Sequence, residues 1–248
     1  MGLLENKQAV ITGGGTGIGL GIAKGFLSEG ASVAIVSRSA DIKKIDIDNK
    51  EENIAVINID LTDRDKRTDL VNNMVSNLGK VDILVNCHGV VTPQDAATHS
   101  DEDWDITIET NLSSTFFMCK TIGSHMINNN YGKIINISSM YAFFGGLKVA
   151  AYTASKGGVA QLTKALSNEW AGLGVNVNSI APGYIRTDLN RHVWETDLKR
   201  SQEIIDRTPA GRWGDPEDIA GPAIFLASHL SDFINGVIIP ADGGFAAR

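Results

Sequence analysis

A glycine-rich turn near the start of the chain limits the folds open to it. The apolar run Gln8-Ala9-Val10-Ile11 stops at Thr12-Gly13-Gly14-Gly15-Thr16-Gly17-Ile18-Gly19, and apolar residues then recur at helical spacing. Glycine lacks a Cβ, so such a backbone can approach a pyrophosphate, and the helix N-terminus offers free N–H groups. A second apolar run at 32–36 completes the strand–turn–helix–strand order of a dinucleotide site. The expected contacts from the turn are Gly13, Gly15, Thr16, Gly17, Ile18 and Gly19.

The end of the second apolar run bears on which dinucleotide is bound. In NAD sites an acidic residue about 20 positions after the glycines bonds the ribose. Ser37 and Arg38 stand there instead, and a guanidinium can bind a 2′-phosphate. The pair slightly favours NADP(H), with NAD(H) held by Ser37 as a nearly equal alternative. Asp60-Leu61 ends the third apolar run, where Asp60 either reaches an adenine amino group or caps a turn.

Apolar runs and helical patterns alternate along the rest of the chain, which predicts an α/β protein with a parallel sheet covered on both faces. We expect a single domain, residues 1–248. A long helix is expected to begin at Ser100, and Thr62 is placed to cap an earlier one. The other expected elements are strands at 54–59, 83–85, 133–137, 175–180 and 236–239, a short exposed helix or loop at 41–53, a helix at about 151–171, and a polar, irregular substrate lid at about 186–212.

The composition argues against several classes of function. A net charge of −7 does not suggest a nucleic-acid-binding surface. Cys87 and Cys119 are the only cysteines, too few for a disulfide framework or a four-cysteine metal site, and no His/Cys/Asp cluster has zinc spacing. No stretch is apolar for the length of a membrane span, and the N-terminus lacks a signal-peptide core. We therefore expect a cytoplasmic protein with a small-molecule substrate, no metal and no membrane partner.

Tyr152 and Lys156 lie four positions apart and therefore on one face of a helix. A lysine ammonium one turn away favours the phenolate, so Tyr152 becomes a usable acid/base, although from spacing alone a solvated surface pair is the commoner case. Ser139 follows the fifth apolar run, and ligands of open parallel sheets bind beyond the carboxyl ends of strands. Asn111, amid apolar neighbours, is either a structural tie or part of a proton path.

Taken in order, these motifs resemble the short-chain dehydrogenase/reductase family over nearly the whole chain. The matching segments are the turn 12–19, Asn86-Cys87-His88-Gly89 where the family has Asn-Asn-Ala-Gly, Asn111, Ser139, Tyr152 with Lys156, and Pro182-Gly183 leading to Thr187. The resemblance implies a Rossmann-like, doubly wound sheet of about seven strands, a nicotinamide cofactor and a homotetramer.

The resemblance also implies a role for each matching residue. Ser139 would bind the substrate oxygen, and Tyr152 would give or take its proton. Lys156 would lower the pKa of Tyr152 and bond the nicotinamide ribose, while Asn111 would hold a water that passes protons to solvent. The remaining cofactor contacts implied by the family are Asn86, Gly89, Pro182, Gly183, Ile185 and Thr187, of which Ile185 and Thr187 would position the carboxamide.

Within the family, several stretches resemble the sugar-acid branch, which includes 2-deoxy-D-gluconate 3-dehydrogenase, the 2-keto-3-deoxygluconate oxidoreductase. Examples are Asn168-Glu169-Trp170-Ala171 and the tail 242–248. A sugar acid needs a cation for its carboxylate, and Lys148 is the candidate, with Arg186 and Arg191 weaker and a solvated loop lysine equally plausible. This branch is usually NAD-linked, in contrast to the Ser37-Arg38 signal.

Two other functions compete with this one. A 3-oxoacyl-[acyl-carrier-protein] reductase would need a basic patch for its acidic partner, and the mixed charges of 186–212 argue weakly against one. A non-catalytic dinucleotide-binding regulator is the alternative of another class, and an intact Ser139, Tyr152 and Lys156 speaks against it.

Overall fold

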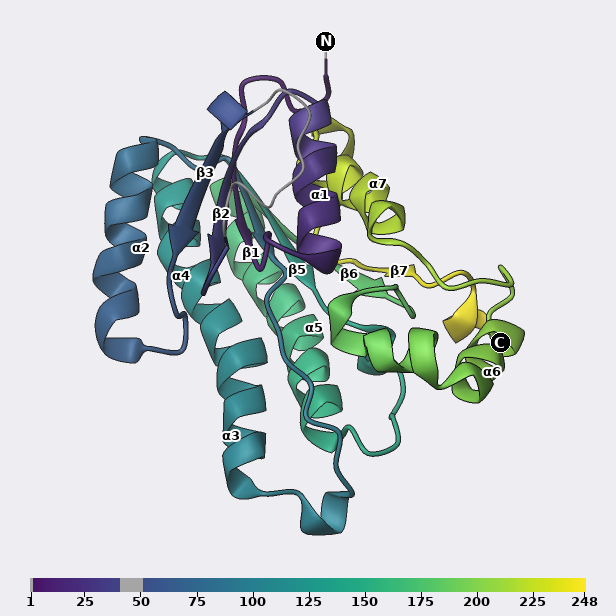
Figure 1. Ribbon diagram of the computed structural model, residues 1–248. Helices are drawn as coiled ribbons and strands as arrows, with labels where there is room; N and C mark the ends of the chain where they lie inside the picture. The colour runs from purple at the N-terminus through teal and green to yellow at the C-terminus, as the bar shows by residue number, and fades with distance from the viewer. Residues whose placement is uncertain (1, 41–50) are drawn as a thin grey trace.

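The computed structural model describes residues 2–40 and 51–248, and seven strands form one parallel sheet at its centre (Figure 1). The strands are β1 (Gln8–Thr12), β2 (Ser32–Ser37), β3 (Ile54–Asn58), β4 (Ile83–Asn86), β5 (Gly132–Ile137), β6 (Val175–Pro182) and β7 (Ile238–Ala241). Their order is β3-β2-β1-β4-β5-β6-β7. The direction of winding reverses between β1 and β4, and ligands of such sheets bind in the crevice that opens there. The predicted doubly wound α/β fold is confirmed.

Side chains of the central strands alternate between two apolar cores, one on each face of the sheet. Ala9 and Ile11 of β1 join the core beneath α1 (Gly17–Ser28) and α7 (Pro216–Ala227), whereas Val10 joins the opposite one. Three helices cover that opposite face: α2 (Arg64–Leu78), α4 (Ser114–Asn128) and α5 (Ala150–Trp170) (Figure 1). Burial on both faces explains why these strands read as continuous apolar runs.

The structure moves several element boundaries relative to the sequence prediction. The sixth strand continues to Pro182, and the last strand runs over Ile238–Ala241. Asp63, not Thr62, caps α2 by accepting a hydrogen bond from the Lys66 amide, because the Thr62 hydroxyl donates to Asp60 instead. Within the expected element at 41–53, residues 41–50 lie outside the described part of the chain, and Glu51–Asn53 form a 3₁₀ turn.

The long helix expected from Ser100 is interrupted in its middle. Ser100 caps α3 (Asp101–Ile108) as predicted, accepting from the Asp103 amide. A π-turn over Glu109–Ser113 then inserts an extra residue before α4 begins. Such insertions occur frequently at functional sites, and this one contains Asn111.

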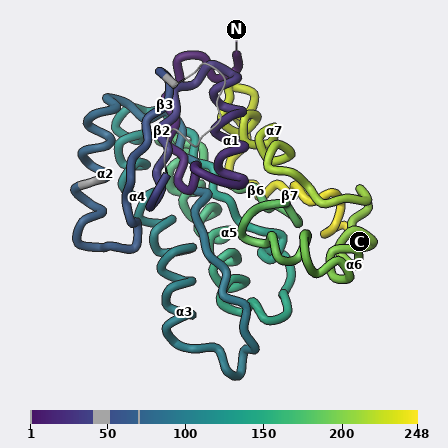
Figure 2. The backbone as a smooth tube through the Cα atoms, viewed as in Figure 1, coloured from purple at the N-terminus to yellow at the C-terminus, as the bar shows by residue number. Residues whose placement is uncertain are grey.

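The segment 186–212, called the lid below, is more regular than its sequence suggested. It contains a π-turn at His192–Thr196 and the helix α6 (Leu198–Arg207). The chain ends beside α6, where the Arg248 guanidinium donates to the Asp206 carbonyl (Figure 2). The lid is polar because most of its outer face meets solvent, while Ser201 and Ile204 face inward.

Candidate active site

A cavity of about 570 Å³ opens at the carboxyl ends of the central strands. The residues that line it and that the sequence assigned to the site are Gly13, Thr16, Gly17, Ile18, Gly19, Ser37, Arg38, Asp60, Leu61, Gly89, Ser139, Tyr152, Lys156, Pro182, Gly183, Ile185 and Thr187. Residues spread over most of the chain thus meet at one site.

The glycine turn forms the floor of the cavity in a conformation that other residues would strain. Gly13 and Gly17 have φ of +68° and +50°, in the left-handed region that favours glycine. A Cβ on Gly19 would lie 2.2 Å from the Gly13 carbonyl oxygen, and one on Gly17 would reach the Thr187 side chain at 3.1 Å. The open backbone and the N-terminus of α1 fit the pyrophosphate of a dinucleotide.

At the other end of the cavity, Ser37, Arg38 and Asp60 lie beside the turn where an adenosine ribose would sit. The Thr62 hydroxyl and amide both donate hydrogen bonds to the Asp60 carboxylate. These hydrogen bonds, together with the nearby positive charge of Arg38, hold the pKa of Asp60 below its usual range. Arg38 is exposed and lines the cavity. A cation and an anion therefore stand side by side at this rim.

Ser139, Tyr152 and Lys156 are brought together between β5 and α5. Ser139 is 6% exposed and shares a hydrogen bond with Tyr152 that favours the phenolate. Burial acts more strongly in the opposite direction and raises the pKa of Tyr152 to about 12. The Lys156 ammonium donates to the Ile137 carbonyl at 2.7 Å and lies 5.7 Å from the centre of the Tyr152 ring.

Burial is thus the larger influence, and the pKa of Tyr152 lies above its ordinary value and not below it. The Lys156 ammonium group is held by a main-chain carbonyl at the end of β5, and its charge does not offset the effect of burial on the phenol. Burial also lowers the pKa of Lys156 to about 8. A lysine with a pKa near neutrality exchanges protons readily at physiological pH.

Asn111 lies behind this group, fully buried, and its amide is committed on both sides. Its Oδ1 accepts from the Val90 amide at 2.8 Å, and its Nδ2 donates to the Val90 carbonyl and the Ser155 hydroxyl. A Cβ on Gly89 would lie 3.2 Å from Asn111 Oδ1 and 3.6 Å from Lys156 Nζ, so the three are adjacent. Asn111 is thus both a structural tie and a neighbour of Lys156, although its own side chain does not line the cavity.

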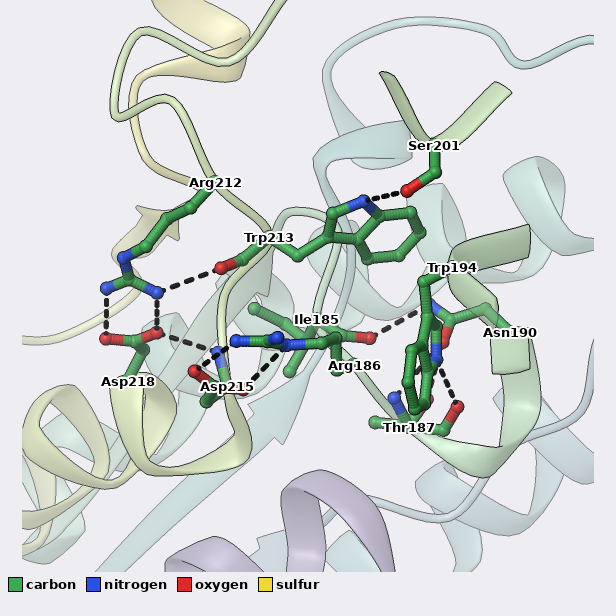
Figure 3. Close-up of polar contacts among 10 residues, drawn as sticks. All are labelled: Ile185, Arg186, Thr187, Asn190, Trp194, Ser201, Arg212, Trp213, Asp215 and Asp218. Carbon is green, nitrogen blue, oxygen red and sulfur yellow. Dashed lines mark hydrogen bonds and ion pairs between the residues drawn. The ribbon is translucent and has the colours of Figure 1, made fainter. Parts of the chain in front are cut away.

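The lid joins the body of the protein through a short two-stranded bridge (Figure 3). Ile185 pairs with Gly214, and Arg186 forms a two-pronged ion pair with Asp215. On the lid side, Asn190 accepts from the Thr187 amide, and the Trp194 indole donates to the Thr187 carbonyl (Figure 3). Thr187 is consequently fixed next to Gly17 of the glycine turn.

Three other predicted residues lie away from the cavity wall. Gly15 is near Ala40, where a Cβ would lie 3.0 Å from the Ala40 Cβ, and Asn86 is buried with its Nδ2 donating to Asn136. Lys148 is 64% exposed and forms an ion pair with Asp95 at 3.2 Å. The structure does not bring Lys148 to the cavity, because its loop turns it toward the segment that follows β4.

Several cavity residues were not singled out from the sequence. Cys87 and His88 line it, and the sequence signal was their departure from the family's Asn-Asn-Ala-Gly pattern. Outside the cavity wall, the Tyr141 ring packs edge-on against Tyr152, and its hydroxyl oxygen lies 3.0 Å from that of Tyr184. Nothing local in the sequence pairs Tyr141 with Tyr184.

Two other kinds of feature are absent from the described residues. Over residues 2–40 and 51–248, no cluster of three or more His, Cys, Asp or Glu side chains is arranged to hold a metal ion. No helix in the same ranges has the length and apolar character needed to cross a membrane.

Comparison with known proteins supports the same assignment. A family model described as enoyl-(acyl carrier protein) reductase matches residues 13–246. The chain is 44% identical to 2-dehydro-3-deoxy-D-gluconate 5-dehydrogenase of Pseudoalteromonas atlantica (99% of this chain, 98% of that protein) and 43% identical to the Escherichia coli protein of the same name (99% and 97%). A gluconate 5-dehydrogenase from Burkholderia cenocepacia, solved with NADP and tartrate, superposes with a TM-score of 0.90 at 34% identity (99% and 97%). The chain therefore belongs to the short-chain dehydrogenase/reductase family of oxidoreductases.

Proposed function

We propose that this oxidoreductase acts on a sugar acid, interconverting the C5 hydroxyl group of 2-dehydro-3-deoxy-D-gluconate and the corresponding ketone. The observation that carries the proposal is the meeting of Ser139, Tyr152 and Lys156 at the wall of the cavity that the glycine turn floors. Support for the substrate comes from relatives of that name, which match this chain over nearly their whole length.

The chain's own residues divide the chemistry between oxygen binding and proton transfer. Ser139 binds the reacting oxygen, and Tyr152 removes its proton in oxidation or supplies one in reduction. The nicotinamide ring, when bound, supplies the acceptor or donor of the hydride. Lys156 exchanges the proton with Tyr152 and, through a water beside Asn111, with solvent.

The residues at the adenosine end favour NADP(H) over NAD(H) in our proposal. Arg38 supplies a guanidinium for a 2′-phosphate, and no carboxylate replaces Ser37 at the end of β2. Asp60 acts against this preference, because its charge stands beside Arg38. We therefore propose that both cofactors are accepted, with NADP(H) preferred.

A sugar-acid substrate also requires a cation for its carboxylate. The lid arginines named from the sequence are both occupied, Arg186 by Asp215 and Arg191 by Asp188. Lys148 remains a proposal, although it reaches the substrate only by leaving Asp95.

Arg200 of α6 is the stronger candidate. Arg200 and Arg207 are seven positions apart and share one stripe of α6 with the buried Ile204. Arg207 lies 4.2 Å from the centre of the Phe245 ring, whereas within residues 2–40 and 51–248 no ion pair engages Arg200. Burial raises the pKa of Tyr141, and the positive charge of Arg200 acts in the opposite direction. Arg200 therefore lies within electrostatic range of the Tyr141 phenol.

Three further expectations from the sequence and the family resemblance belong to the same proposal. The lid closes over the substrate, turning at the bridge between Ile185 and Gly214. The protein assembles as a homotetramer, which light scattering of the purified protein would test. It acts in the cytoplasm, which fractionation of the source cells would test.

A screen of sugar acids with both cofactors tests the proposed function. We expect oxidation of 2-dehydro-3-deoxy-D-gluconate, with weaker turnover of gluconate. A protein that reduced only 3-oxoacyl thioesters would be the acyl-carrier reductase. One that bound NADPH yet turned over no alcohol or ketone would be a regulator.

A further inference from the structure

His88 connects the cofactor turn to the π-turn behind the catalytic group. It follows β4 directly and lines the cavity. Its Nδ1 lies 2.6 Å from the Thr12 hydroxyl oxygen at the end of β1, and its Nε2 lies 2.6 Å from the Ser114 hydroxyl oxygen at the start of α4. One imidazole ring therefore contacts two elements on opposite sides of the site.

The neighbouring hydrogen bonds favour one direction for each contact. The Ser114 hydroxyl donates its one proton to the Thr110 carbonyl at 2.5 Å, so it accepts from His88 Nε2–H. The Thr12 hydroxyl accepts from the Cys87 amide at 3.1 Å, and its own proton can bond either the Val85 carbonyl at 3.4 Å or His88 Nδ1 at the much shorter 2.6 Å. One neutral tautomer, protonated at Nε2, satisfies every group.

The ring stays neutral at physiological pH. Burial, together with the positive charge of Lys156, lowers the pKa of His88 to about 3. A neutral ring protonated at Nε2 leaves Nδ1 as the acceptor for the Thr12 hydroxyl.

The two partners of His88 belong to functionally different parts of the site. Thr12 begins the glycine turn, and a Cβ on the adjacent Gly13 would lie only 2.9 Å from the His88 amide nitrogen. Thr110 and Ser114 flank Asn111, which is tied on its other side to Val90 and to Ser155 of α5. His88 thus anchors one side of the π-turn, and the contacts of Asn111 hold the other side.

We propose that His88 is a positioning residue, with Nδ1 fixing the cofactor turn and Nε2 fixing the π-turn that carries Asn111. The part that concerns turnover rests on the proposed function, whereas cofactor binding and π-turn order can be measured without any substrate. Each nitrogen serves one task, so the two tasks can be separated by substitution.

The test uses two substitutions that each retain one nitrogen's contact. In His88→Asn, the amide oxygen keeps an acceptor near Nδ1 for Thr12 and loses Ser114. In His88→Gln, the amide NH₂ keeps a donor near Nε2 for Ser114 and loses Thr12. The same two changes at the exposed His229 serve as controls for the substitution itself.

For each variant we would measure the Kd for NADPH by fluorescence, amide hydrogen exchange over residues 109–114 in the protein alone, and kcat. We expect His88→Asn to keep the NADPH Kd within about twofold while exchange in the π-turn speeds up and kcat falls about tenfold, as loss of one buried hydrogen bond implies. We expect His88→Gln to weaken NADPH binding about tenfold and leave exchange in the π-turn near that of the wild type.

Ser114→Ala provides a second route that leaves the histidine in place. It should reproduce the exchange and kcat of His88→Asn, and the double variant should be no worse than either single one. The proposal would be overturned if His88→Asn and His88→Gln changed the NADPH Kd, the hydrogen exchange of the π-turn and kcat in the same way. It would also be overturned if the variants lowered Tm but left that exchange and the Kd unchanged. If the wild type turned over no sugar acid, the Kd and exchange measurements would still decide the role of His88.

Discussion

Replacing Arg38 by alanine should shift cofactor choice from NADPH toward NADH. Arg38 lines the adenosine end of the cavity with an exposed guanidinium, and Asp60 is the nearby acid. A hydrogen bond between a guanidinium and a phosphate contributes about 1.5–3 kcal/mol, and solvent exposure favours the lower figure. Because 1.4 kcal/mol corresponds to a factor of ten, kcat/KM for NADPH should fall about tenfold.

The same substitution should leave kcat/KM for NADH within about twofold, because NADH has a hydroxyl group where NADPH has the phosphate. Loss of Arg38 also leaves the Asp60 charge uncompensated beside the phosphate, which acts in the same direction. The assay is initial-rate kinetics with each cofactor at a saturating concentration of one substrate, repeated at two ionic strengths. The preference of the wild type for NADPH over NADH should weaken at the higher ionic strength.

Two further variants make the interpretation specific. Asp60→Asn removes the neighbouring negative charge and should raise the ratio of NADPH to NADH efficiency, while any contact of Asp60 with adenine cancels in that ratio. Lys66→Ala removes an exposed cation that pairs with Asp63 outside the cavity, and should leave the ratio unchanged. Equal losses with both cofactors in Arg38→Ala would remove Arg38 from the 2′-phosphate and refute the reasoning.

Three other predictions follow from the site. Tyr152→Phe should lower kcat by at least about a hundredfold, which is the usual scale of acid/base catalysis, and should leave the Kd for NADPH unchanged. Unaltered turnover would show that another group moves the proton. The pKa of Lys156 is about 8 in the folded protein, against an ordinary value of 10.5. Between these two values the unfolded chain binds more protons than the folded protein does. The free energy of unfolding should therefore rise between pH 8 and pH 10, by up to about 3 kcal/mol. Urea titrations should find that rise reduced in Lys156→Met. Arg200→Ala should raise the KM for acidic sugars about tenfold and leave the KM for neutral sugars unchanged, with Lys199→Ala as the matched control. If Lys148→Ala gave this pattern instead, Lys148 would be the residue that binds the substrate carboxylate.

Much of the fold and the outline of the site could be predicted from the sequence, because the responsible patterns are local. The glycine turn needs only its own backbone and the helix that follows, and the i,i+4 spacing of Tyr152 and Lys156 holds in any helix. Continuous apolar runs separated by helical patterns require a parallel sheet covered on both faces. The carboxyl ends of its strands then collect Ser139, Asp60 and Pro182 at one edge.

The tertiary structure alone decided which partners these residues have. Lys156 donates to Ile137, 19 positions away, and burial raises the pKa of Tyr152, whereas the i,i+4 spacing predicted that Lys156 would lower it. Lys148 pairs with Asp95, 53 positions away, and not with the cavity.

The π-turn at Asn111 and the bridge made by His88 have the same origin. His88 bonds residues 76 and 26 positions away, and its role exists only because β1, β4 and α4 meet there. Hydrogen-bond partners and desolvation depend on atoms contributed by distant parts of the chain. The sequence therefore determined which groups are candidates for the chemistry, and packing determined their partners and their protonation.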